Sequence, residues 1–184
     1  MKNKGLQFAE LHCLSNYSFL RGASHPEELV ARAYELGYQA LALTDECTYS
    51  GLVKAHVAAK KLNIKLIVGA EFSFNAEPKT AKTIATDEKL ILLAPTRSAY
   101  GQLSTFISVL RRRSDKGHYN AELKDFSFGL KDCIALWVPG QQDIDSQVSL
   151  GAQIKTALPK LWLALELFHD GHDLDKTAHI LTLS

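Results

Sequence analysis

The stretch that decides the fold is ALALTDEC, residues 40–47, in which an apolar run ends in polar side chains. Two further stretches have the same form, ELHCLS at residues 10–15 and LIVGAEF at residues 66–72. Helical patterns separate the three, and in a barrel of parallel strands the carboxyl ends of the strands converge on one mouth. Carboxylates and an imidazole that converge in this way suit divalent metal binding or acid–base chemistry. The polar residues expected to meet at this mouth are His12, Asp45, Glu46 and Glu71.

Strand-like and helix-like patterns alternate along the chain, which predicts parallel βαβ units with right-handed crossovers. We expect one helix that is N-capped by Ser24 and ends at Gly37. A second helix presents Leu52, Ala55 and His56 on one face, which predicts a core position for His56. The predicted strands are 6–14, 38–43, 65–74, 89–94, 133–138 and 161–167. The second helix covers 49–62, and the later helices are 98–113, 146–157 and 173–182.

The composition is that of a soluble globular domain. The chain has 184 residues, of which 46% are hydrophobic and 22% charged. Its formal net charge of +1 gives no overall attraction to nucleic acid or to a membrane surface. No apolar run is long enough to span a bilayer, and the N-terminus lacks the apolar core of a secretory signal. Three widely spaced cysteines without a C-x-x-C motif favour a reducing cytoplasm.

The polar, weakly patterned segments 75–88 and 114–131 are interpreted as surface excursions. Neither has the composition of a linker between domains. We therefore predict a single domain that spans residues 1–184.

A longer series of motifs connects the three stretches. FAELHCLSNYSFLRGAS occupies residues 8–24, GLVKAH occupies 51–56, and RRR, ALWVP and LWLALEL follow at 111–113, 135–139 and 161–167. In this order the motifs resemble the PHP (polymerase and histidinol phosphatase) domain. Within that family they are most similar to the N-terminal region of error-prone bacterial DNA polymerases of the C family.

The resemblance implies both a fold and a function. The fold is α/β, a PHP-type distorted (β/α) barrel with parallel strands that is incomplete at its C-terminus, because the family's later D-x-H motif is not reached. The function is that of the PHP region of an error-prone DNA polymerase, which links the chain to DNA replication, DNA repair and damage-induced translesion synthesis. The palm carboxylates that transfer nucleotides are not reached either. We therefore expect the chain alone to be an inactive scaffold, whether as the N-terminal part of a polymerase or as a truncated gene product.

The same resemblance implies partners and a location. The expected partners are the remainder of a C-family polymerase and DNA, in the cytoplasm and without membrane contact. An incomplete barrel also leaves an open strand edge, which favours self-association.

Three departures from the family pattern concern the metal site. Metal-binding PHP domains open with H-x-H, but Leu14 stands in place of the second histidine. The family's T-D-H is TDE at residues 44–46, and Arg21 replaces an acidic residue. The positive charge of Arg21 repels a divalent cation and can neutralise a neighbouring carboxylate, Glu46 or Glu71. We therefore expect a degenerate site formed by His12, Arg21, Asp45, Glu46 and Glu71, in which zinc or manganese binds His12, Glu46 and Glu71 weakly or not at all.

Some of these residues allow a second interpretation. His12 is either a metal ligand or a structural histidine bonded to loop backbone. Neighbouring residues of a strand point to opposite faces, so Asp45 beside Glu46 can instead cap the following turn. Glu71 is either a mouth residue or a surface carboxylate. HDGHD at residues 169–173 has metal-like spacing but is interpreted as a solvated loop.

The only basic cluster is Arg111, Arg112 and Arg113, with Lys116 and His118 close by. Cations at a helix C-terminus complement the helix dipole, and in an intact polymerase they would also contact DNA phosphates. The alternative function is a free-standing metal-dependent phosphoesterase, in which a metal-activated water is the nucleophile. The loss of ligands argues against this alternative.

Overall fold

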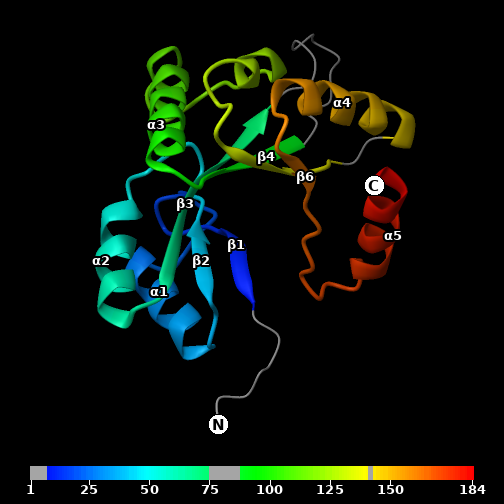
Figure 1. The fold of residues 1–184 in the computed structure, drawn as a ribbon. Coiled ribbons are helices and arrows are strands. Elements are labelled where there is room, and N and C mark those ends of the chain that lie inside the picture. The colour runs from blue at the N-terminus through cyan, green and yellow to red at the C-terminus, as the bar shows by residue number, and fades with distance from the viewer. Residues whose placement is uncertain (1–7, 75–87, 141–142) are drawn as a thin grey trace.

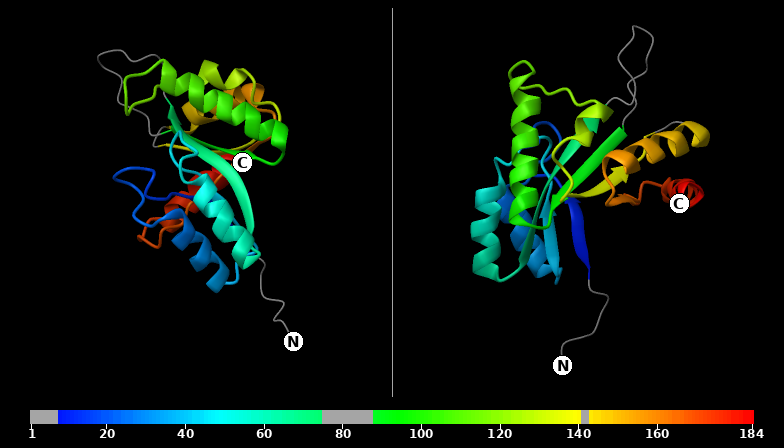
Figure 2. Two further views of the ribbon diagram at one scale, coloured as in Figure 1. Left: turned by 90° about the vertical axis from the view of Figure 1, so that its left-hand side faces the viewer. Right: turned by 45° about the horizontal axis from the view of Figure 1, so that its top comes forward.

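The structure is a computed structural model that describes residues 8–74, 88–140 and 143–184. Within these residues six strands form one sheet in sequence order, and the sheet curls strongly, with helices packed against its outer side (Figures 1 and 2). The strands are β1 Ala9–Cys13, β2 Ala40–Leu43, β3 Lys65–Phe74, β4 Glu88–Ala94, β5 Ile134–Val138 and β6 Leu161–Leu163. The helices are α1 Pro26–Glu35, α2 Leu52–Leu62, α3 Arg97–Arg112, α4 Ile144–Ala157 and α5 Asp173–Leu183, with a 3₁₀ helix, η1, at Leu123–Ser127.

The predicted α/β fold with an incomplete, curled barrel is confirmed, but the expectation of parallel strands is wrong for one strand. β1, β2 and β3 pair in parallel, as do β5 and β6, whereas β4 pairs antiparallel with both of its neighbours. A parallel neighbour needs a long crossover, usually a helix, whereas an antiparallel one does not. Residues 75–87, which connect β3 to β4, carry no helical pattern, and the predicted excursion there lies outside the described residues.

The two faces of the sheet have different surroundings, because side chains alternate along each strand. On the outer face, Leu41 and Leu43 pack with α1 and α2, and Phe72 packs with α3 and α4 in the main core. On the inner, concave face a small apolar cluster includes Ile91. Glu71 is the register partner of Ile91 between β3 and β4, so its side chain also belongs to the concave face.

The helices match the predicted pattern with two corrections. α1 is capped by His25 rather than Ser24, and the backbone N–H of His25 donates to Glu28 Oε2 at 2.8 Å. His56, predicted to face the core, is exposed, because the buried stripe of α2 runs through residues such as Ala55 and Ala59. None of the helices in the described residues combines the length and apolar character that crossing a membrane requires.

The second predicted surface excursion, 114–131, contributes side chains to the core, which corrects that interpretation. Ala121, Phe126 and Leu130 are buried in the main cluster, and Phe126 contacts the rings of Phe72 and Phe106. These apolar residues are too widely spaced to form a recognisable helix or strand pattern. The segment therefore covers the outer core beside α3 with a few buried apolar side chains, while many of its other residues are exposed.

Candidate functional site

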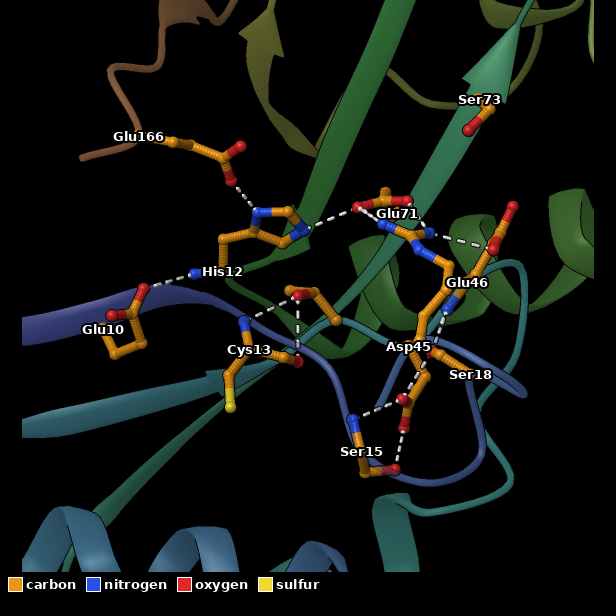
Figure 3. A network of polar contacts seen from close by, with 12 residues as sticks. Glu10, His12, Cys13, Ser15, Ser18, Asp45, Glu46, Glu71, Ser73 and Glu166 are labelled. Carbon is orange, nitrogen blue, oxygen red and sulfur yellow. Dashed lines mark hydrogen bonds and ion pairs between the residues drawn. The ribbon is translucent and has the colours of Figure 1, made fainter. Parts of the chain in front are cut away.

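Charged side chains from distant parts of the chain meet on the concave face, near the ends of β1 and β2 (Figure 3). The Nε2 atom of His12 lies 2.7 Å from Oε2 of Glu71, and its Nδ1 atom contacts Oε1 of Glu166, in the segment after β6. Arg21, in the loop after β1, donates from Nη1 to Glu71 Oε1 and to Glu46 Oε2, the latter at 2.9 Å, and from Nη2 to Glu71 Oε2 at 3.1 Å. We call this group the polar cluster; its members are His12, Arg21, Glu46, Glu71 and Glu166.

Backbone contacts fix the spacing within the polar cluster. Glu46 and Glu71 form a parallel β-bridge just beyond the end of β2, in which the Cys47 N–H donates to the Glu71 carbonyl at 2.9 Å. The register between β1 and β2 shifts between Glu10 and Cys13, and the His12 N–H donates to Glu10 Oε1 at 2.9 Å. The irregular end of β1 therefore places the His12 side chain over β3.

Electrostatics make His12 a cation. Carboxylate oxygens only accept hydrogen bonds, and both ring nitrogens of His12 contact them, so the ring carries two N–H groups. Burial lowers the pKa of His12, but the hydrogen bonds with Glu166 and Glu71 outweigh burial and raise it to about 9. Burial raises the pKa of Glu71, but hydrogen bonds from His12 and Arg21 outweigh it and lower the pKa to about 2. Both groups are therefore ionised at neutral pH.

Asp45 lies outside the polar cluster and organises the loop that delivers Arg21. Its buried carboxylate accepts from the Ser15 N–H, the Ser15 hydroxyl and the Ser18 hydroxyl, each at 2.7 Å. The Ser18 hydroxyl in turn accepts from the Glu46 N–H at 2.9 Å. A side chain at Gly22 would overlap the Ser15 carbonyl, so the loop folds back tightly on itself. Asp45 thus stabilises the loop after β1, so its second interpretation, as a cap of the turn that follows it, is wrong about which segment is held.

Tyr119 and Arg111 hold Glu46 from the side of α3. The Tyr119 hydroxyl donates to Glu46 Oε1 at 2.8 Å and accepts from the Ser73 N–H at 2.8 Å. Arg111 donates to the backbone carbonyls of Glu46 and Cys47, each at 3.1 Å. Arg111 therefore supports the backbone under the polar cluster.

The other two arginines of the predicted DNA-binding cluster lie further out. Arg113 pairs with the carboxylate of Asp125, and Arg112 is exposed at the end of α3. Two of the three guanidinium groups thus have intramolecular partners, and DNA contact stays a prediction.

The predicted pairing of Arg21 is confirmed for both Glu46 and Glu71. Sequence reasoning missed Glu166 and Tyr119. Because β6 ends at Leu163, Glu166 follows an apolar strand in the same way as the residues that were selected, but the longer predicted strand 161–167 concealed this. Tyr119 lies in an unpatterned segment, where no signal marked it.

The residues of the polar cluster do not fit a divalent metal ion. Both ring nitrogens of His12 are engaged, the Arg21 guanidinium bridges Glu46 and Glu71, and Leu14 offers no donor atom. Across residues 8–74, 88–140 and 143–184, no group of three or more His, Cys, Asp or Glu residues could hold a metal, and this range includes 169–173. Weak or absent metal binding stays a prediction.

Comparison with known proteins gives a family and a set of relatives. Residues 10–157 match the family model of the PHP domain. A protein named error-prone DNA polymerase from Saccharophagus degradans is 45% identical over 160 residues, and one from Methylococcus capsulatus is 48% identical over 170 residues. These matches cover 87% and 90% of the chain but only 15% of either relative. The chain thus spans about a seventh of the length of the curated relatives it matches.

A solved structure has the same fold. It belongs to a candidate metal-dependent phosphoesterase from Bifidobacterium adolescentis and matches with a TM-score of 0.60 and 14% sequence identity. The match covers 97% of this chain and 85% of the other. At this identity the likeness establishes a shared fold and carries no argument about activity.

Proposed function

This chain belongs to the PHP domain family, and from that premise we propose that it is the PHP region of an error-prone DNA polymerase. The support is the identity of 45% and 48% to two proteins of that name over most of the chain. Because the chain corresponds to 15% of each relative, polymerase chemistry would belong to the rest of such a protein. On this proposal the partners are the polymerase body and DNA, and the setting is damage-induced translesion synthesis and repair in the cytoplasm.

Within such a polymerase, we propose that the chain acts as a scaffold rather than as a hydrolase. The observation that carries this proposal is the Arg21 guanidinium bonded to both Glu46 and Glu71. Metal-assisted hydrolysis needs a metal with an open coordination position, which activates a water. The side chains that could supply ligands are instead joined to one another, which suits a structural role.

A chimaera tests the polymerase context. The matching region of the Saccharophagus degradans relative is replaced by this chain, and primer extension on DNA is measured. We expect extension to be retained, because about half of the aligned residues are identical. A control chimaera that carries Glu71→Gln in this chain should lose activity together with thermal stability. A chimaera that folds but extends no primer would contradict the proposal.

A hydrolysis assay tests the scaffold role against the phosphoesterase alternative. The 184-residue chain receives manganese or zinc together with a chromogenic phosphate ester or a 3′-labelled oligonucleotide. We expect no turnover, because the polar cluster offers no open metal position. Robust turnover that disappears in His12→Ala and Glu71→Ala would establish the phosphoesterase instead.

Contact with DNA is proposed for the exposed end of α3. Arg112 is exposed there, next to two arginines with internal partners. In the chimaera, Arg112→Ala should weaken DNA binding for all sequences. The slope of the logarithm of the affinity against the logarithm of the salt concentration should become shallower by about 1. An unchanged slope would mean that Arg112 does not contact DNA.

A further inference from the structure

The polar cluster has the charge balance of an occupied metal site. We propose that the Arg21 guanidinium and the His12 imidazolium together replace one divalent cation, so that the native cluster excludes metal and removal of Arg21 alone turns it into a cation site. The proposal rests on the scaffold role only in that the native cluster needs no metal. It goes further, because it states what performs the metal's electrostatic task.

The charges of the cluster support this substitution. Two cations, Arg21 and His12, face three carboxylates, those of Glu46, Glu71 and Glu166, which leaves one net negative charge. One divalent ion bound by a neutral imidazole and the same carboxylates would leave the same net charge. The exchange therefore conserves the charge that the buried part of the site contains.

The geometry supports it as well. Nη1 of Arg21 bridges oxygens of Glu46 and Glu71, as an ion shared by two carboxylates would. The Glu71 side chain is 0% exposed and its oxygens are occupied by Arg21 and His12 together. Carboxylates brought so close repel one another unless a cation lies between them. In the native chain that cation is supplied by the protein itself.

The exposure of Arg21 and the contacts that hold its loop make the conversion of the cluster into a cation site testable. The Arg21 side chain is 31% exposed, so solvent reaches the guanidinium side of the cluster. The loop around Arg21 is held by Asp45 through Ser15 and Ser18, not by the guanidinium. Shortening Arg21 should therefore open a path to the carboxylates while the loop keeps its course.

The experiment uses the full chain, treated with chelator and then titrated with manganese chloride. Calorimetry measures binding, and the melting temperature is followed in parallel. Wild type should bind no Mn²⁺ and show no shift. Arg21→Ala should melt at a lower temperature, bind about one Mn²⁺ per chain, and regain melting temperature as Mn²⁺ increases, because a ligand that binds the folded state stabilises it. Arg113→Ala, which removes a different arginine–carboxylate pair, should show no response to Mn²⁺.

Two further variants keep the test decisive. Arg21→Lys retains a positive charge and should bind no Mn²⁺, and Arg21→Ala/Glu71→Gln should bind at least about tenfold more weakly than Arg21→Ala. If Arg21→Ala is unfolded without metal, recovery of its native circular dichroism with Mn²⁺ supports the proposal, and failure to recover overturns it. Binding of Mn²⁺ by wild type, or a folded Arg21→Ala that binds none, also overturns it. Neither result implies hydrolysis, so the scaffold role is judged separately by turnover.

Discussion

The carboxylate of Glu71 is removed from solvent and is bound by two cations that the chain supplies from β1 and from the following loop. A buried charge costs several kcal/mol unless partners compensate for the lost hydration. The loss of one partner is therefore more damaging than the loss of an exposed ion pair. Glu71 should therefore contribute more to the free energy of unfolding than any other residue of the polar cluster.

Replacement of Glu71 by glutamine measures this contribution to the free energy of unfolding. Glu71→Gln removes the buried carboxylate that His12 and Arg21 share and should lower the free energy of unfolding by about 3 kcal/mol. The matched control is Glu35→Gln, in the exposed i,i+3 pair with Arg32, which should cost no more than about 0.5 kcal/mol. Urea denaturation gives both values. Equal effects would mean that the polar cluster is solvated like the surface pair.

The pKa shifts predict a pH dependence with a definite sign. His12 keeps its proton up to about pH 9 in the folded chain but only up to 6.5 in the unfolded one, so its stabilisation is complete below 6.5 and is lost as pH rises through 9. Glu71, with its pKa lowered from 4.5 to about 2, stabilises fully above 4.5, and this contribution is lost as pH falls through 2. Between pH 6.5 and 9, the free energy of unfolding should fall in wild type and much less in His12→Gln. Urea denaturation at several pH values tests this, and parallel profiles would contradict it.

At the scale of elements, the sequence predicted well what depends on local periodicity. The strands β1, β2, β3 and β5 and the helices α1 to α5 occur close to their predicted ranges. The direction of β4 could not be predicted, since it depends on pairing between strands and not on any pattern within one strand. The site was predictable to the same degree: residues that directly follow an apolar run were found, whereas Tyr119, delivered by an irregular segment, was not.

The loop of residues 14–24 is the element that positions Arg21, and Asp45 should control its order. Asp45→Ala removes the acceptor for three donors and should cost about 2–3 kcal/mol. Trypsin cleaves after arginine, so cleavage after Arg21 should become faster in this variant. Cleavage after Lys116, in an exposed turn far from this loop in sequence, is the internal control. Unchanged cleavage at both positions would show that the loop does not depend on Asp45.

Gly22 tests the packing of the same loop, and Gly101 in α3 is its control. A methyl group at Gly22 would overlap the Ser15 carbonyl, whereas at Gly101 in α3 it meets open space. Gly22→Ala should therefore destabilise the chain. Gly101→Ala should stabilise it by about 0.5–1 kcal/mol, because alanine favours the helix interior. Melting temperatures compare the two, and a neutral Gly22→Ala would show that the loop adjusts without cost.

At the scale of the molecule, the curled sheet has two edges that differ. At β1, the His12 N–H donates to the Glu10 side chain, and the His12 ring contacts Glu166, in the segment after β6. At β6, Trp162 is 66% exposed. β6 is the last strand in the sheet order, and an edge strand with an exposed aromatic residue is a site where a second strand can add. The β6 edge is therefore the better candidate for contact between chains.

We expect the isolated chain to self-associate through β6, with a second copy as the partner. Trp162→Lys places a charge on the edge and should shift the chain toward monomer, because edge charges oppose strand addition. The matched control is Phe19→Lys, since Phe19 is an aromatic residue that is 82% exposed but lies in the loop after β1. Size-exclusion chromatography with light scattering over a range of concentrations measures the mass of each. If both variants dissociate equally, association depends on general surface hydrophobicity. If wild type is monomeric throughout, the β6 edge does not bind a second copy of the chain.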